Sequence, residues 1–453
     1  MMKAINPANG NLVGEYPTHA PQALDDILTQ TQQDWKTWRT TSFEHRADLM
    51  MNAAAVLRKH SEKYARLMSL EMGKVISEAR AEVEKCAWVC EYYAENAKSF
   101  LADEIVATEA SKSFVSYDPM GIVLAVMPWN FPFWQVFRFA APALMAGNAG
   151  ILKHASNVPG SALAIEEVFR EAGFPEHIFR ALLISSGEVE AVIRDSRVKA
   201  VTLTGSEWAG MQVASIAGSE LKKTVLELGG SDPYIVLEDA DILACVTTSA
   251  KARMINTGQS CIAAKRFIVV ESRLKEFEEA QAAILSGLKM GDPLQEDSQV
   301  GPLARLDLRD ELHDQVTRTL SQGGRLITGG NMVEGPGAFY QPTVISDVKK
   351  GMAIYAEETF GPVSAIIPVK DEEEAIKVAN DSDFGLGGSL WTADVKKGEA
   401  LARRVESGAV FVNAMTMSDP RMPFGGIKKS GYGRELGIYG IREFVNIKSI
   451  WIK

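Results

Sequence analysis

The sequence predicts an α/β protein built from two doubly wound domains. Short apolar runs of strand length alternate with stretches of helical periodicity, which is the pattern of a mostly parallel sheet covered by helices. The runs form two consecutive series, and a chain of 453 residues is long enough for two or three domains. We therefore expect two sheets, each with its own hydrophobic core.

Helices are expected before the first series of strands. Apolar side chains recur at helical spacing over 21–38, where a proline at the first position suits a helix start. Two further amphipathic segments cover about 43–60 and 76–97. In the last segment Cys86 and Cys90 lie on the apolar face, so we interpret both as core thiols.

The apolar runs predict the strands of both sheets. The first series is 121–128, 149–153, 181–185, 199–205 and 223–230. The second series is 266–271, 325–330, 363–369, 387–392 and 408–413. The segments 111–119 and 445–453 alternate like exposed strands and belong to neither series. We expect these two to pair with each other or with another subunit.

Composition and charge exclude several classes of function. A formal net charge of −10 without a dense Lys/Arg run predicts no nucleic-acid partner. No apolar run reaches the ~18 residues of a membrane helix, and the N-terminal segment lacks a secretory pattern. We expect a cytoplasmic protein without membrane contact. Four cysteines without CxxC spacing predict free thiols and no metal site.

Cys261 is the candidate nucleophile. It ends the polar, glycine-containing stretch 256–261, between a helical segment and a strand that starts near Lys265. A loop cysteine is accessible, whereas taken alone this thiol could also be incidental and buried. An unperturbed thiol, with a pKa of about 8.5, is mostly protonated at neutral pH, so a nucleophile here needs a base.

Glu227 and Asn130 are candidates for the groups that assist it. Glu227 ends a strand-like run beside Gly229 and Gly230, at the edge where open parallel sheets bind ligands. The alternative for this glutamate is a solvated carboxylate at a strand end. Asn130 lies between a strand and a helix in PWNFP, where the prolines stiffen the turn. Its amide could stabilise an oxyanion.

A third strand end suggests a phosphate site. Thr204, Gly205 and Ser206 follow an apolar run and precede a helical one. Backbone amides there, with the Ser206 hydroxyl, could hold a pyrophosphate at the helix N-terminus. The motif is not GxGxxG, so it has little weight alone.

Six motifs, in this order and spacing, resemble the aldehyde dehydrogenase superfamily over essentially the whole chain. They are PWNFP, LTGS, LELGG, NTGQSC, EETFGP and PFGGIKKSGYGRE. The segments 128–148, 152–157, 226–233 and 265–271 resemble the short bacterial succinate-semialdehyde dehydrogenases. The resemblance implies an aldehyde dehydrogenase-like fold, with a Rossmann-type cofactor domain, a second α/β catalytic domain and a small β oligomerisation arm.

The resemblance also implies domain boundaries and an assembly. The cofactor-binding domain would comprise 1–105 and 120–229, the catalytic domain 230–438, and the arm 106–119 and 439–453. The expected assembly is a homodimer or homotetramer, and the expected partner a small aldehyde.

By the same resemblance, the Cys261 thiolate attacks the aldehyde, and the Asn130 amide and the Cys261 N–H hold the alkoxide. Hydride then passes to nicotinamide, and Glu227 directs water onto the thioester that remains. The cofactor-binding residues implied are Trp129, Lys153, Ser156, Thr204, Gly205, Ser206, Leu228, Glu358 and Phe360.

Ser156 departs from the pattern of many NAD-specific members, which carry a glutamate three residues after the lysine. A carboxylate would repel the 2′-phosphate of NADP, whereas a serine beside Lys153 can donate a hydrogen bond to it. We predict that NADP is preferred and that NAD remains usable.

Arg138 and Ser418 are the implied substrate-binding residues. Arg138 lies eight residues after Asn130 and matches an arginine that binds the carboxylate in longer succinate-semialdehyde dehydrogenases. The predicted substrate is succinate semialdehyde or a similar small ω-carboxy aldehyde. In the alternatives, Arg138 forms a structural salt bridge and the enzyme oxidises uncharged aldehydes, or the fold is not catalytic.

Two further positions depart from relatives. Ile255 stands where some long members carry a second arginine, and Arg421 is a candidate substitute. Ala263 stands where certain members carry a second cysteine, which excludes that redox disulfide.

Overall fold

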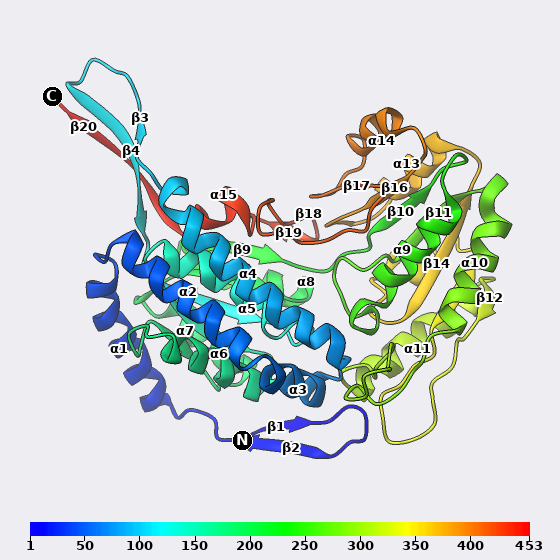
Figure 1. Cartoon of the computed structure of the whole chain (residues 1–453), viewed down its shortest axis with the longest axis horizontal. Helices are drawn as coiled ribbons and strands as arrows, with labels where there is room; N and C mark the ends of the chain where they lie inside the picture. The colour runs from blue at the N-terminus through cyan, green and yellow to red at the C-terminus, as the bar shows by residue number, and fades with distance from the viewer.

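The computed structural model describes residues 1–453 and contains two α/β units with a narrow β arm extending from one of them (Figure 1). One unit has a six-stranded sheet and the other a seven-stranded sheet, so the predicted fold class is confirmed. None of the helices combines the length and apolar character that a membrane crossing needs.

The six-stranded sheet has the order β19-β9-β8-β5-β6-β7 and is parallel except for β19. Its strands are β5 (Ile122–Met127), β6 (Ala149–His154), β7 (Phe179–Ala181), β8 (Val198–Thr204), β9 (Lys223–Glu227) and β19 (Gly431–Tyr432). The expected strand at 181–185 is misplaced, because β7 ends at Ala181. The residues after it leave the sheet and cap a short helix, with Ser185 and Glu188 forming a capping box.

Eight helices accompany this sheet before β9. They are α1 (Pro21–Trp38), α2 (Phe43–Lys59), α3 (Ser61–Met72), α4 (Ile76–Phe100), α5 (Trp134–Met145), α6 (Pro159–Glu171), α7 (Val189–Arg194) and α8 (Glu207–Ser219). The three helices expected from periodicity are confirmed as α1, α2 and α4. Helix α3 was not expected; it is capped at its C-terminus by Gly73, whose φ of 81° is a left-handed conformation suited to glycine. An N-terminal hairpin joins β1 (Met2–Ile5) to β2 (Leu12–Tyr16).

The seven-stranded sheet has the order β12-β13-β14-β11-β10-β16-β17, and only the β12–β13 pair is antiparallel. Its strands are β10 (Pro233–Val236), β11 (Arg266–Val270), β12 (Arg325–Thr328), β13 (Thr343–Ser346), β14 (Val363–Val369), β16 (Ser389–Trp391) and β17 (Phe411–Val412). Its helices are α9 (Ile242–Met254), α10 (Leu274–Ser286), α11 (Leu306–Ser321), α12 (Ala353–Ala356), α13 (Glu372–Asn380) and α14 (Val395–Ala402). Strands β10 and β13 were not expected. Strand β10 begins at Pro233 and β13 follows Pro342, and a proline argues against an interior strand when only the sequence is considered.

The arm is a three-stranded sheet. Strand β20 (Val445–Ile452) pairs antiparallel with the whole of β4 (Lys112–Pro119), and β3 (Glu104–Ile105) covers the other edge of β4. The predicted pairing of 111–119 with 445–453 is therefore confirmed. The sheet begins two residues before the segment expected to form the arm. The remaining α-helix and strands are α15 (Gly437–Ile441) and the short antiparallel pair β15 (Phe384–Gly385) and β18 (Ile427–Lys428).

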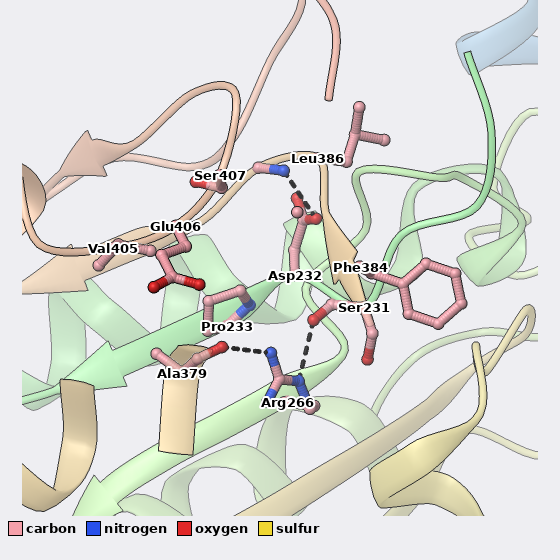
Figure 2. A pocket seen from close by; sticks show the side chains of 12 residues that line it. Ser231, Asp232, Pro233, Arg266, Ala379, Phe384, Leu386, Val405, Glu406 and Ser407 are labelled. Carbon is pink, nitrogen blue, oxygen red and sulfur yellow. Dashed lines mark hydrogen bonds between the residues drawn. The ribbon is translucent and has the colours of Figure 1, made fainter. Parts of the chain in front are cut away.

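A buried polar cluster fixes the chain where it passes from β9 to β10 (Figure 2). Arg266 donates hydrogen bonds to the carbonyl oxygens of Ser231 and Ala379, each at 2.9 Å. Asp232 accepts from the Gly387 N–H at 3.0 Å. The space left among these groups is about 10 Å³, roughly that of one water. The cluster therefore braces the connection between the two sheets.

Candidate active site

The loop before Cys261 has an unusual backbone. A short 3₁₀ turn, Ile255–Gly258, follows α9, and inside it Asn256 and Thr257 have φ values of 51° and 55°. Positive φ is uncommon outside glycine and is a genuine outlier for a β-branched residue such as threonine. A Cβ at Gly258 would lie 2.2 Å from the Gly361 carbonyl oxygen, so only glycine fits. Tertiary contacts must hold this loop.

Those contacts join the loop to the Asn130 turn. The Asn256 N–H donates to Glu78 Oε2 at 2.7 Å, and its side-chain amide donates to the Asn130 carbonyl at 2.7 Å. Asn130 Nδ2 in turn donates to the Gln259 carbonyl at 3.2 Å. An amide nitrogen carries two N–H groups, so Asn130 keeps one for a ligand. The predicted nucleophile and oxyanion donor are thus held together.

A buried carboxylate fixes the other side of the Asn130 turn. Glu82 Oε1 accepts from the backbone N–H groups of Phe133 and Trp134, each at 2.9 Å, where α5 starts. Glu82 also forms an ion pair with the buried Lys74. The first N–H groups of a helix have no intrahelical partner, so this contact satisfies two of them and fixes the direction of α5.

Lys265 is a site residue that sequence reasoning missed. Its buried ammonium donates to the Cys261 carbonyl at 2.7 Å and to the Gly230 carbonyl at 2.6 Å, and pairs with Glu358 at 2.6 Å. It therefore links the nucleophile loop to a predicted cofactor-binding residue. Two of its three partners, Gly230 and Glu358, lie 35 and 93 positions away, so no local pattern could indicate them.

The Cys261 thiol is protonated in this state. Burial raises its pKa to about 12, although the positive charges of Arg138 and Lys265 act in the opposite direction. The other three cysteines are fully buried, which confirms that Cys86 and Cys90 are core thiols. Cys261 alone is partly exposed.

Glu227 ends β9, as predicted, but its carboxylate is turned into the protein. The residue is 2% exposed, and neither carboxylate oxygen has a hydrogen-bond partner. A Cβ at Gly425 would lie 2.5 Å from Glu227 Oε1, so the carboxylate packs on that glycine. Burial first, and then the negative charge of Glu435, raise the pKa of Glu227 well above its ordinary value, while Arg138 lowers it.

Two cavities meet at Cys261. The first has a volume of about 220 Å³ and the second about 360 Å³, and Cys261 and Gln135 line both. The first cavity is lined by seven of the predicted cofactor residues and by Asn130. These seven are Trp129, Thr204, Gly205, Ser206, Leu228, Glu358 and Phe360. Glu227 lines neither cavity.

Two predicted cofactor residues lie outside the first cavity, at the end of the neighbouring strand β6. Lys153 is 8% exposed and has no ion-pair partner, and burial lowers its pKa. Ser156 is exposed in the turn that follows β6. The ends of β5, β6, β8 and β9 therefore share one edge of the sheet, as in other open parallel sheets that bind ligands.

The second cavity contains both predicted substrate-binding residues, Arg138 and Ser418, in a lining that is half apolar and half polar. The Arg138 guanidinium forms an ion pair with Glu435 and lies 4.6 Å from the Phe424 ring centroid. Its charge is therefore already balanced within the protein. Ile255 also lines this cavity. Arg421 does not: it is exposed and pairs with Asp419 at 2.7 Å.

Comparisons with known proteins agree with this arrangement. The aldehyde dehydrogenase family model matches residues 1–450. The chain is 51% identical over 448 residues to a Synechocystis protein named probable succinate-semialdehyde dehydrogenase (NADP+), covering 99% of both chains. It is 48% identical over 451 residues to Mycobacterium tuberculosis succinate-semialdehyde dehydrogenase (NADP+) 1, again covering 99% of both.

A solved structure extends the similarity to three dimensions. It is a succinic semialdehyde dehydrogenase from Streptococcus pyogenes in complex with NADP+, with a TM-score of 0.98, 39% identity and complete coverage of both chains. Motifs, cavities and relatives together establish that this chain belongs to the aldehyde dehydrogenase family.

Proposed function

We propose that this protein oxidises succinate semialdehyde, or a similar small ω-carboxy aldehyde, to the carboxylic acid, with NADP as the preferred acceptor and NAD as a second one. The observation that carries the proposal is the position of Cys261 between two cavities, one suited to the cofactor and one to the aldehyde. The two relatives named above support the substrate and the cofactor.

The residues of the first cavity fit a dinucleotide. Ser206 is the N-cap of α8, so the free N–H groups of that helix start favour a pyrophosphate. Lys153, at the end of the neighbouring strand β6, offers an unpaired cation. Because residue 156 is a serine, no carboxylate of this residue would face the 2′-phosphate on the adenosine ribose of NADP. Trp129, Glu358 and Phe360 would surround the nicotinamide end. When bound, NADP accepts the hydride that the thiohemiacetal carbon releases.

The protein's own groups perform the remaining chemistry. The Cys261 thiolate adds to the aldehyde, and the free Asn130 N–H and the Cys261 backbone N–H stabilise the alkoxide; such a donor contributes about 2.7–4 kcal/mol. Glu227 must rotate away from Gly425 to take the thiol proton and later a proton from water. Leaving its buried position also lowers its pKa, which makes it a base.

An uncharged aldehyde is the second candidate substrate. The ion pair between Arg138 and Glu435 favours it, because a paired guanidinium attracts a carboxylate less strongly. Apolar side chains such as Phe131 and Met415 would accept an alkyl chain.

We also infer a cytoplasmic homodimer or homotetramer assembled through the arm. Ile447 and Trp451 of β20 are 63% and 57% exposed, and an edge strand with such side chains is usually covered. Size measurement in solution, with a variant lacking residues 445–453 as control, tests the assembly.

A kinetic panel tests the function. Succinate semialdehyde and butanal are each offered with NADP and NAD, and Cys261→Ala serves as the inactive control. The proposal expects the highest kcat/KM for succinate semialdehyde with NADP, and loss of all activity in Cys261→Ala without loss of folding. Equal efficiency for the two aldehydes would favour the second candidate, and a Cys261→Ala enzyme above a tenth of wild-type kcat would overturn the mechanism.

A further inference from the structure

Lys85, on α4, brings a cation into the second cavity. Its ammonium donates a hydrogen bond to Ser418 Oγ at 2.8 Å and lies 4.2 Å from the centroid of the Trp134 ring. The side chain is partly buried, and no carboxylate lies within ion-pair distance of it. A partly desolvated ammonium whose contacts are a hydroxyl and an aromatic ring still lacks an anion.

The other charged groups of this cavity do not supply that anion. Glu82 forms an ion pair with Lys74 and accepts a hydrogen bond from a backbone N–H at the start of α5. Glu78 accepts a hydrogen bond from the Asn256 N–H. Arg138 is balanced by Glu435. Lys251, the remaining cation, is solvent-exposed. Lys85 is therefore the cation of the cavity that is both withdrawn from solvent and uncompensated.

We infer that Lys85, together with Ser418, binds the ω-carboxylate of the aldehyde and sets the preference for ω-carboxy aldehydes over uncharged ones. The inference rests on the proposed function. Ser418 accepts its hydrogen bond from Lys85, so its own O–H is free to donate to the same carboxylate. The Lys85 ammonium and the Ser418 hydroxyl can therefore donate to one carboxylate. Such charge-assisted hydrogen bonds are stronger than those between neutral groups.

The surroundings of Lys85 predict how its binding depends on pH. Burial, and then the positive charge of Arg138, lower the pKa of Lys85 to about 8, while the negative charges possible at Cys86, Glu82 and Asp419 act in the opposite direction. Below this pKa the ammonium binds a carboxylate, and above it the charge is lost. Preference for the ω-carboxy substrate should therefore decline as pH rises through about 8.

The first experiment compares Lys85→Met with Lys98→Met. Lys98 is on the same helix but exposed and paired with Glu44, away from the cavity, so the control makes the same chemical change. Lys85→Met should lower kcat/KM for succinate semialdehyde by about 30-fold or more, mainly through KM, since that is typical of losing a charge-assisted pair. For butanal, both variants should stay within about threefold of wild type. An equal loss for both aldehydes, or no loss, would overturn the inference.

The second experiment compares the wild type with Lys85→Arg and measures how the substrate preference of each depends on pH. The ratio of kcat/KM for succinate semialdehyde to that for butanal cancels ionisations that both reactions share. In the wild type this ratio should fall above pH 8, by up to about tenfold per unit. In Lys85→Arg it should stay level to pH 10, because a guanidinium does not deprotonate there. A wild-type ratio that stays level, or a Lys85→Arg ratio that falls in parallel with it, would overturn the role of Lys85.

These outcomes separate the inference from the proposed function. If the wild type oxidises neither aldehyde with NADP or NAD, the proposed function fails. If the wild type prefers succinate semialdehyde and Lys85→Met retains that preference, only the inference about Lys85 fails.

Discussion

Arg138 and Glu435 form an ion pair in which both side chains are buried, with exposed fractions of 2% and 5%. Arg138 also lines the second cavity. Glu435 raises the pKa of Glu227, and Arg138 lowers the pKa of both Glu227 and Cys261. One guanidinium therefore neutralises a structural carboxylate and favours the ionised forms of two predicted catalytic groups.

Replacing Arg138 with leucine should impair the oxidation of both succinate semialdehyde and butanal. The change leaves Glu435 buried without its partner, which typically costs about 3–5 kcal/mol of stability. It also removes the charge that favours the Cys261 thiolate. Thermal unfolding and kcat/KM for both substrates measure this. The double variant Arg138→Leu/Glu435→Leu should recover much of the stability but not the activity.

A carboxylate-binding role for Arg138, as the sequence alone predicts, leads to a different result. In that case Arg138→Leu raises KM for succinate semialdehyde steeply and leaves butanal almost unaffected. The two expectations are opposed, so the same pair of substrates decides between them.

Glu227→Gln should slow deacylation. The amide keeps the shape of the side chain but cannot accept a proton from water. Mass spectrometry of the variant mixed with substrate and NADP should detect an acyl adduct on Cys261, and cofactor affinity should change little. Steady-state turnover equal to wild type would contradict a role for Glu227 as base.

Alkylation of Cys261 in the ligand-free enzyme should be slow at pH 7. Because burial raises the pKa of this thiol to about 12, the reactive thiolate fraction should increase about tenfold per pH unit up to pH 10 without a plateau. The other cysteines are fully buried, so iodoacetamide labelling reports on Cys261, and Cys261→Ala gives the background. A plateau near pH 8 would mean that the thiol is already activated.

Ser156→Glu should move the cofactor preference towards NAD. The new carboxylate would repel a 2′-phosphate that carries nearly two negative charges, and would accept hydrogen bonds from the ribose hydroxyls. The ratio of kcat/KM for NADP to that for NAD should fall. An unchanged ratio would place Ser156 away from the 2′ position, and Ser156→Ala controls for loss of the hydroxyl alone.

The sequence by itself determined the fold class, most of the strands and the resemblance to the family. These depend on local periodicity and on contiguous motifs. Helix 21–38 and the strand pairing of 111–119 with 445–453 are clear because each has enough residues to show its period. Strands β10 and β13 start at or directly after a proline, which argues against an interior strand, and they are defined only by their neighbours in the sheet.

The sequence also indicated that the Asn130 turn and the end of β9 share one region, because strand ends in an open parallel sheet share an edge, and the family resemblance added Cys261 to it. It could not show which charges are paired there and which are left without a counter-charge. Arg138 meets Glu435, Lys265 meets Glu358 and Lys85 meets Ser418 across separations of 93 to 333 residues. Only the tertiary structure decides such partners, because a buried charge meets whatever group the packing places beside it, and no local sequence pattern encodes that choice.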